Sequence, residues 1–409
     1  MRKDTQMIKL GRLMALLLGL ACAAAARADG TEAYTGNLAY AEAVADFNGD
    51  GMPDVAVVNM YDDNVSVLMS TTASGSTSLS FADQQPFYTG YGPQAVSAAD
   101  LNGDGKPDLI VGNCSDNTVA VFMNTTVQGS TTASFADPVE LQGANGPCAM
   151  TVVDVNGDGL PDIVTADLGD NAVAVFLNTT PQGAAVPSFA AAQSFAVGSS
   201  PWSIVAADIN GDGKLDIAVV NLDDSTMSVL INTTAAGDTT PSFLSQQVFP
   251  GGNGPQAIAA GDLNGDGKPD MAVAGYGDTL AYVLINTTVT GSSIASFATA
   301  QTFDYGSSTY SVSIADVNGD GTPDIVIADA ATGGAYVWVN STPTGSSSVS
   351  VVDGQELNPH DGGWAIAVTT ADMNGDGMPE ILLVNAGNGE VNVLLNATAP
   401  GDTNLSFLP

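Results

Sequence analysis

The chain has 409 residues, of which 44 are acidic and eight are lysine or arginine, so its formal net charge is −36 at pH 7. Such an excess of negative charge repels phosphate backbones and anionic lipid surfaces, which excludes nucleic acid and anionic membranes as expected direct partners. The length is large for one ordinary hydrophobic core but natural for a ring of repeats.

The first 28 residues have the pattern of an export signal. Basic residues precede an apolar run at 13–26, and a small-residue cleavage motif ends at Ala28. The run is too short to span a bilayer, and no other stretch is apolar enough to do so. Lipidation of Cys22 is an alternative, but Gly19 stands where a lipidation motif prefers leucine. We expect a signal peptide over 1–28 and a protein that is secreted, periplasmic or held at the cell surface.

The remaining part, residues 29–409, is more acidic still. It contains three lysines, no arginine and 43 acidic residues, which gives a net charge of −40. Of these acidic residues, 21 belong to one repeated motif. A divalent cation bound to each copy would neutralise much of this charge, so metal binding is the economical explanation of half of the acidity.

That motif is a nine-residue loop that first occurs at 46–54 with the pattern D-x-N-G-D-G-x-P-D. Its seven copies occupy 46–54, 100–108, 154–162, 208–216, 262–270, 316–324 and 372–380. Their first residues are 54 positions apart five times and 56 apart once. A fixed long period predicts one supersecondary unit that is copied and stacked.

Each copy contains signals for four short strands. In the second copy these are the segments 93–99, 109–111, 118–123 and 134–141, separated by turn-rich residues. The segment after the acidic loop is apolar without alternation, which indicates a strand covered on both faces. We therefore predict an all-β, seven-bladed β-propeller. Helical calcium hands are contradicted by the β-branched flanks, and a parallel β-helix has a much shorter repeat.

The two ends of the chain are complementary. The last copy stops at 405–409, before the segment that completes the other copies, whereas residues 32–36 resemble 86–90 at the end of the first copy. We expect the two termini to complete one outer strand together, which removes a free sheet edge.

The loop has the composition of a calcium site. Side-chain oxygens at positions 1, 3, 5 and 9, the main-chain carbonyl of position 7 and a glycine at position 6 suit a hard cation. Calcium fits this set better than magnesium or zinc, and up to seven ions are expected. Asn, Gly and Asp also make good turns, but a turn does not need four oxygen side chains in every copy. The predicted ligands are Asp46, Asn48, Asp50, Met52, Asp54; Asp100, Asn102, Asp104, Lys106, Asp108; Asp154, Asn156, Asp158, Leu160, Asp162; Asp208, Asn210, Asp212, Lys214, Asp216; Asp262, Asn264, Asp266, Lys268, Asp270; Asp316, Asn318, Asp320, Thr322, Asp324; and Asp372, Asn374, Asp376, Met378, Glu380.

The pattern, followed by an apolar strand, resembles the FG-GAP repeats of integrin α-subunit propellers, the related bacterial VCBS repeats and fungal seven-bladed lectins. The resemblance covers nearly all of residues 30–409. It implies that the acidic loop joins the first two strands of a blade and binds calcium. The Phe-Gly and Gly-Ala-Pro signatures of the animal repeats are only faintly echoed, for example at 91–93 and 253–255. The resemblance therefore does not give the ligand.

Two cysteines follow the signal, Cys114 and Cys148. They lie in adjacent repeats at places that the expected topology puts on one face, so they could form a disulfide in an oxidising compartment. The Asn-Thr-Thr sequence recurs at 124, 178, 232 and 286 and matches a glycosylation sequon. Its recurrence at one strand end favours turn chemistry instead.

No catalytic residue is assigned. His360 is the sole histidine and has Asp361 beside it, but no nucleophile is evident, so a polar loop role is favoured. The lack of arginine after the signal removes the usual clamp for carboxylate or phosphate substrates. Carboxylate pairs for glycoside hydrolysis remain an alternative, although nothing singles out one pair.

Aromatic residues recur near the start of each repeat. Six residues before the first loop aspartate are Tyr40, Trp202 and Tyr310, and Trp364 lies nearby in the last copy. Such rings could bind sugars or a peptide, or could pack around the propeller axis. A hairpin aspartate, such as Asp62, recurs on the same face in five copies, where a turn role is favoured.

These features lead to one main hypothesis and two alternatives. The main hypothesis is an exported, calcium-stabilised propeller that binds a glycan or an extracellular protein, with no nucleic acid partner and no membrane span. The first alternative is a polysaccharide lyase or hydrolase on the same scaffold. The second is a structural module of a cell-envelope assembly.

Overall fold

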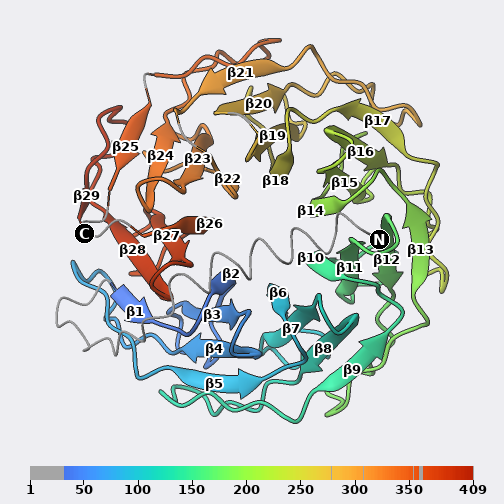
Figure 1. Ribbon diagram of the computed structural model, residues 1–409, viewed down its shortest axis with the longest axis vertical. Coiled ribbons are helices and arrows are strands. Elements are labelled where there is room, and N and C mark those ends of the chain that lie inside the picture. Colours follow the sequence, from blue (N-terminus) through green and yellow to red (C-terminus); the bar gives the residue numbers. More distant parts are fainter. Residues whose placement is uncertain (1–31, 278, 307, 353, 359–362, 409) are drawn as a thin grey trace.

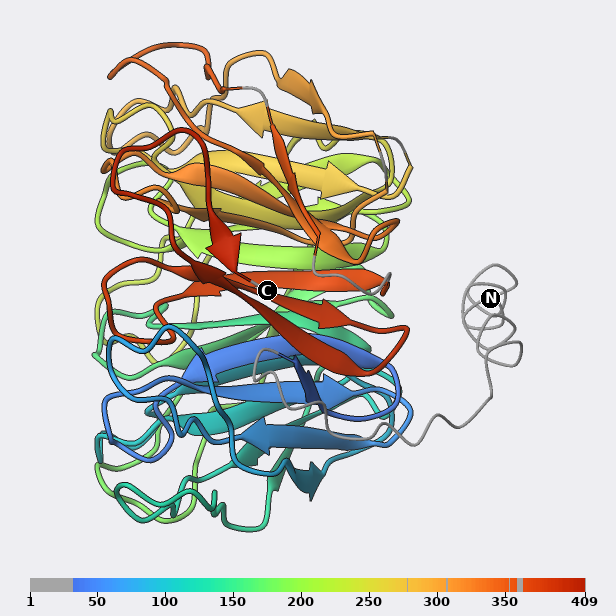
Figure 2. The same ribbon diagram turned by 90° about the vertical axis from the view of Figure 1, so that its left-hand side faces the viewer.

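The computed structural model describes residues 32–277, 279–306, 308–352, 354–358 and 363–408. The predicted signal peptide, Cys22 and His360 with Asp361 lie outside this part of the chain. The described residues form seven antiparallel sheets around a central axis, and each sheet is one blade of a propeller (Figure 1). Seen from the edge, the strands cross the thickness of the ring and the loops lie at its two faces (Figure 2).

Each blade is built outward from the axis in chain order. The innermost strands are β2 (Ala39–Ala45), β6 (Pro93–Ala99), β10 (Pro147–Val153), β14 (Pro201–Ala207), β18 (Pro255–Gly261), β22 (Val312–Ala315) and β26 (Ala365–Ala371). The second strands are β3 (Asp54–Asn59), β7 (Asp108–Asn113), β11 (Asp162–Asp167), β15 (Asp216–Asn221), β19 (Asp270–Gly275), β23 (Asp324–Asp329) and β27 (Glu380–Asn385).

The third strands are β4 (Asn64–Leu68), β8 (Thr118–Phe122), β12 (Ala172–Phe176), β16 (Thr226–Leu230), β20 (Leu280–Leu284), β24 (Gly334–Trp338) and β28 (Glu390–Asn396). The outer strands of blades 1 to 6 are β5 (Gln85–Tyr88), β9 (Val139–Gln142), β13 (Gln193–Ala196), β17 (Gln247–Pro250), β21 (Gln301–Asp304) and β25 (Gln355–Leu357). This arrangement confirms the predicted four-stranded repeat.

The fourth strand begins later than predicted. In blade 2 the expected segment was 134–141, whereas β9 is Val139–Gln142 and Phe135 forms only a single bridge with Asn124. The reason is that the residues between β8 and β9 leave the sheet and form a long loop next to the acidic loop of blade 1. We call this loop, and its equivalent in every blade, the 3–4 loop.

The second strands carry the core. Every residue of these strands is buried in all seven blades. Their apolar side chains alternate between the two neighbouring blades, so clusters of buried residues fill the spaces between adjacent sheets. This burial confirms the interpretation of the non-alternating apolar segments as strands covered on both sides.

Ring closure uses both ends of the chain. The strand β1 (Glu32–Tyr34) pairs with β28 of blade 7, and so does the short strand β29 (Phe407–Leu408). The register pairs Ala33 with Val391 and Leu408 with Leu395. Figure 1 shows both strands beside β28 at the outer edge. The prediction that the termini complete one outer strand is therefore confirmed.

Candidate functional sites

The acidic loops are shaped by hydrogen bonds to their own side chains. In the first loop the Asp46 carboxylate accepts bonds from the main-chain N–H groups of Asp50 (3.1 Å) and Gly51 (2.8 Å). Asn48 Oδ1 accepts from the N–H of Asp50, and Asp50 Oδ1 accepts from that of Met52, both at 2.9 Å. Gly51 has φ of 90°, which only glycine adopts without strain. The acidic residues thus hold a tight turn with several oxygens on its inner side.

The same four bonds occur in all seven loops, so the sites are equivalent in construction. Two of the predicted ligand residues of the fifth loop, Asp262 and Asn264, also line a hollow of about 290 Å³ between blades 5 and 6. An ion could therefore reach this loop from solvent.

The ninth residue has a structural role that the sequence did not reveal. Asp54 is fully buried, and its two carboxylate oxygens accept bonds from the N–H groups of Phe47 (2.9 Å) and Ser70 (2.7 Å). It therefore fastens the start of the loop to the end of the third strand. Burial, and then the charges of Asp50 and Asp46, raise the pKa of Asp54 to about 7, against bonds that lower it. A cation in the loop would relieve that repulsion.

The donor set fits calcium, with one condition. Within the described part of the chain, no three Asp, Glu, His or Cys side chains converge as a metal centre by themselves. An ion in a loop would therefore need the asparagine oxygen of position 3 and the carbonyl of position 7 as well as carboxylates. Such a mixed oxygen set is what calcium accepts.

Six of the seven loops are also clamped by the next blade. The side-chain amide of Asn124, at the end of the third strand of blade 2, donates to Phe47 O in loop 1 (2.9 Å) and to Pro107 O in its own loop (2.8 Å). Five further asparagines make the equivalent pair of bonds: Asn178, Asn232, Asn286, Asn340 and Asn396. We call this contact the asparagine clamp. Because these amides are buried and engaged, the turn interpretation of the Asn-Thr-Thr sequences is confirmed.

A main-chain bond accompanies the clamp. The N–H of Gly129, in the 3–4 loop of blade 2, donates to Asn48 O in loop 1 at 2.8 Å. The same bond occurs at every junction, including Gly75 to Asn374, which links blade 1 to blade 7. The acidic loops are thus parts of the interfaces between blades.

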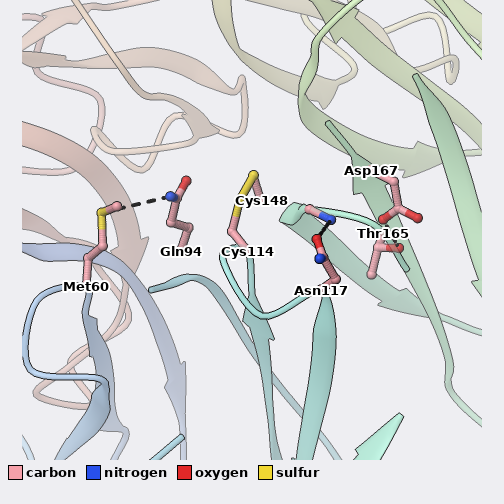
Figure 3. The surroundings of a disulfide bond; sticks show 8 residues. Met60, Gln94, Cys114, Asn117, Cys148, Thr165 and Asp167 are labelled. Atoms are coloured by element: carbon pink, nitrogen blue, oxygen red, sulfur yellow. Dashed lines mark hydrogen bonds between the residues drawn. A yellow bond between two sulfur atoms is a disulfide. The ribbon is translucent and has the colours of Figure 1, made fainter. Parts of the chain in front are cut away.

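The opposite face carries the disulfide. Cys114 lies in the turn between β7 and β8, and Cys148 lies near the start of β10 in the next blade (Figure 3). Their sulfur atoms are bonded, and their Cα atoms are 4.9 Å apart. The disulfide therefore joins blades 2 and 3, as the sequence allowed. Such bonds are typical of proteins that fold outside the reducing cytoplasm.

The two cysteines occupy a pair of positions that recurs around the ring. One is a turn residue after the second strand, and the other lies 34 residues later at the start of the next inner strand. In six blades the pairing register shifts at this second position, which marks a β-bulge. In the junction of blades 5 and 6 the pair is Tyr276 and Tyr310, whose ring centroids are 5.5 Å apart. This position is where the repeats differ most.

Aromatic side chains gather on one side of the face that carries the disulfide, around the inner ends of the blades. Tyr310 lies 5.6 Å from Trp364, centroid to centroid, and 5.5 Å from Tyr276. Tyr40 packs against the same cluster of buried residues as Tyr310 and Trp364, and burial, and then Tyr310, raise the pKa of Tyr40. We call these four residues the aromatic cluster. They come from blades 1, 5, 6 and 7, which are contiguous around the ring.

The structure therefore groups three of the four predicted aromatic residues. Trp202 lies at the bulge of β14 in blade 4 and makes no ring contact with the described aromatic residues. Tyr276 was not predicted, because at the turn after the second strand the recurring aspartate was the feature that the repeats share. Its signal was available, since it stands in the repeat where Cys114 stands in blade 2. Tyr276 is 56% exposed, so the cluster reaches solvent.

Tyrosine and charge are distributed unequally between the two faces. The five exposed tyrosines all lie at or beside the face of the aromatic cluster: Tyr34, Tyr61, Tyr88, Tyr91 and Tyr276. The three lysines of residues 29–409 stand in acidic loops on the other face. The hairpin aspartates support loops, since Asp62 and Asp116 accept main-chain N–H bonds from Asn37 and Tyr91. Asp278 lies outside the described residues.

The fold and the repeated loop define a seven-bladed β-propeller with one acidic loop in each blade. A family model described as the FG-GAP-like repeat matches residues 46–111, 104–165, 154–219, 219–273, 262–327 and 316–383. The chain therefore belongs to the FG-GAP-like repeat family. A search of curated proteins gives no significant match.

Solved structures share the architecture. A crystal structure of BBS1N in complex with ARL6DN, soaked with mercury, is 14% identical, covers 93% of this chain and 100% of that chain, and has a TM-score of 0.57. Selenomethionine-substituted virginiamycin B lyase from Staphylococcus aureus is 8% identical, with 88% and 97% covered and a TM-score of 0.52. At these identities the likeness concerns the fold alone. Among the described residues, no helix is long and apolar enough to cross a membrane.

Proposed function

We propose that this protein is an exported, calcium-stabilised binding module whose aromatic cluster holds a neutral glycan. The observation that carries the proposal is the convergence of Tyr40, Tyr276, Tyr310 and Trp364 at one side of the channel mouth. Aromatic rings fixed on strands and short turns offer flat apolar surfaces at low entropic cost, which suits the faces of sugar rings.

The charge distribution supports a neutral ligand rather than an anionic one. Anionic sugars and phosphorylated ligands need arginine or lysine, and the lysines after the signal are in acidic loops on the far face. The aromatic face instead presents aspartates such as Asp62 and Asp116. Uronic acids would therefore be repelled where neutral sugars would not.

In this proposal calcium is structural. The side chains of positions 1, 3, 5 and 9 and the carbonyl of position 7 would hold one ion in each loop. A bound ion would neutralise the loop carboxylates and fix the turn that the next blade clamps. Chemistry at the ion is not required, because protein oxygens would fill most of its coordination shell.

Export is inferred from two independent features, the signal-like residues 1–28 and the disulfide. Mass spectrometry of the protein recovered from its native host would give the mature N-terminus. We expect it at Asp29; an N-terminus at Met1 would contradict export by this signal, and a lipidated Cys22 would favour anchoring instead.

A glycan array probed with calcium-loaded protein tests the ligand class. We expect binding to neutral oligosaccharides, reduced at least about tenfold by Trp364→Ala and by Tyr310→Ala, which is about 1.4 kcal/mol. Trp202→Ala is the matched control, because Trp202 occupies in blade 4 the repeat position that Tyr310 occupies in blade 6 but lies outside the aromatic cluster. This variant should bind the glycan normally. Silence across neutral sugars, or equal losses in all three variants, would remove the glycan proposal.

A further inference from the structure

The seven junctions between blades are not equally fastened. At six of them an asparagine clamp joins the acidic loops of neighbouring blades. At the junction of blades 7 and 1 the equivalent residue is Ser70. Its hydroxyl accepts a bond from the N–H of Thr72 and makes no bond to the carbonyls of Met373 or Pro53 in the described structure. This junction therefore lacks the clamp.

A second side-chain bond is missing at the same place. In loops 1 to 5 the amide of the position-3 asparagine donates to a carbonyl in the 3–4 loop of the next blade, as Asn48 does to Ser130 O at 3.1 Å. In loop 7 the amide of Asn374 stays within its own loop, where it bonds Asp376 and Glu380. Loop 7 and the 3–4 loop of blade 1 are therefore joined by the main-chain bond from the N–H of Gly75 to Asn374 O, without the side-chain bond. In loop 6 the amide of Asn318 likewise bonds Asp320 of its own loop, so this side-chain bond is also missing between blades 6 and 7, where the asparagine clamp is kept.

The inner strand at this junction contains a buried acid. Glu42 of β2 stands where the other six blades have aliphatic residues: Val96, Met150, Ile204, Ile258, Val312 and Val368. Both carboxyl oxygens are shielded from solvent and make no hydrogen bond of good geometry among the described residues, although the hydroxyl of Thr369 on β26 lies close enough to act on the carboxyl. Val44, on the same side of the strand, packs with Val384 of blade 7, so Glu42 also faces that blade.

No counterion faces this carboxyl. The strands that pack against β2 are β3, β6, β26 and β27. Their only ionisable side chains are Asp54 on β3 and Glu380 on β27, and both are acids. Burial raises the pKa of Glu42 to about 7, although the hydroxyl of Thr369 on β26 lowers it in part. The group is therefore neutral in the folded protein at mildly acidic pH and charged above that range.

We propose that the ring opens first at the junction of blades 7 and 1, and that ionisation of Glu42 makes this opening easier as the pH rises. The outer edge of blade 7 is made by two separate segments, β1 with three register pairs to β28 and β29 with two, and β1 leads directly into the inner strand of blade 1. Every other junction keeps its clamp and its aliphatic side chain, so it resists opening more strongly.

Hydrogen exchange read by mass spectrometry on calcium-loaded protein tests this proposal. After correction for intrinsic rates, peptides from β2 and β26 should exchange at least tenfold faster than those from β10 and β14. Ser70→Asn, which restores the clamp residue, should slow exchange at this junction. Glu42→Val should slow it at pH 8 and have a smaller effect at pH 5.5, where the carboxyl is neutral.

Two controls keep the result interpretable. Asn232→Ser removes the clamp between blades 3 and 4, which the disulfide does not join, and should create fast exchange at that junction. Glu42→Gln replaces Glu42→Val if the latter does not fold. Equal exchange at all junctions, or fast exchange that neither Ser70→Asn nor Glu42→Val slows, would overturn the proposed opening site. Equal effects of Glu42→Val at the two pH values would overturn the role of ionisation.

Discussion

Single buried polar side chains decide how this ring is held. Asp54 and its equivalents connect a loop to a strand, and Asn124 and its equivalents connect two loops. Each is buried, so removal of the side chain leaves donors or acceptors without partners, which costs more than the bond itself contributes. These residues are therefore more sensitive to substitution than the exposed members of the same loops.

We expect Asp162→Asn to lower the free energy of unfolding by about 2–3 kcal/mol, because one amide group would face the N–H of Val155 or Asn178. Urea denaturation at saturating calcium measures this change. Asp137→Asn, an exposed acid outside the loops, is the control and should stay within about 0.5 kcal/mol of the parent. A loss below 0.5 kcal/mol for Asp162→Asn would contradict its fastening role.

The buried Asp167 gives a pH dependence that can be isolated. Burial comes first among the causes that raise its pKa to about 7, and a bond from Thr165 lowers it in part. Because the folded protein binds the proton of Asp167 more tightly than the unfolded chain does, the protonated acid stabilises the fold. This contribution to the free energy of unfolding is fully present below about pH 4 and is lost as the pH rises to about 7. Asp167→Asn, which places the residue of blades 1, 2, 4 and 7 in blade 3, should therefore stabilise the protein above pH 7.

Thermal melts of calcium-loaded protein at pH 5 and pH 8 check this prediction. We expect the variant's advantage in free energy of unfolding over the parent to be at least about 2 kcal/mol larger at pH 8 than at pH 5. The estimate converts the pKa shift of Asp167 at about 1.4 kcal/mol per unit. A difference that does not change with pH would show that the carboxyl is already ionised at pH 5 in the folded protein.

At the scale of elements, the period of the sequence explains why so much could be predicted. Four strands per repeat, the acidic loop between the first two, and the shared outer strand all follow from alignment of one copy with another. The ninth loop residue was predicted only as a ligand because its partners Phe47 and Ser70 depend on the folded register. The asparagine clamp joins residues 77 positions apart, which no local pattern contains.

The disulfide occupies the pair of positions that is filled by Met60 and Gln94 between blades 1 and 2 and by Tyr276 and Tyr310 between blades 5 and 6. Its two cysteines are 34 residues apart, so a loss of roughly 3–4 kcal/mol is expected on reduction from the entropy of the closed loop. Thermal melts with and without a reductant measure it. The double variant Cys114→Ser, Cys148→Ser should match the reduced parent and should not respond to the reductant; a response would indicate another effect of the reagent.

At the scale of the whole molecule, the acidity and the ring are linked. Binding that favours only the folded state contributes about 4 kcal/mol per independent site at a thousandfold excess over the dissociation constant. Several loops would together exceed the usual net stability of a domain, roughly 5–15 kcal/mol. We expect EDTA to lower the melting temperature by tens of degrees and excess calcium to restore it. An unchanged melt in EDTA would contradict calcium in the loops.

The clamp has a direction, which bears on how the ring forms. Each acidic loop is held by residues of the blade that follows it, 77 positions later in the first case. A chain that folds from its N-terminus onward therefore leaves its newest loop unsupported until another blade appears. Only the seventh loop meets a partner that already exists, because Gly75 precedes it by most of the chain. The final step of assembly is thus the one with the fewest side-chain bonds, and it joins the oldest part of the polypeptide to the youngest.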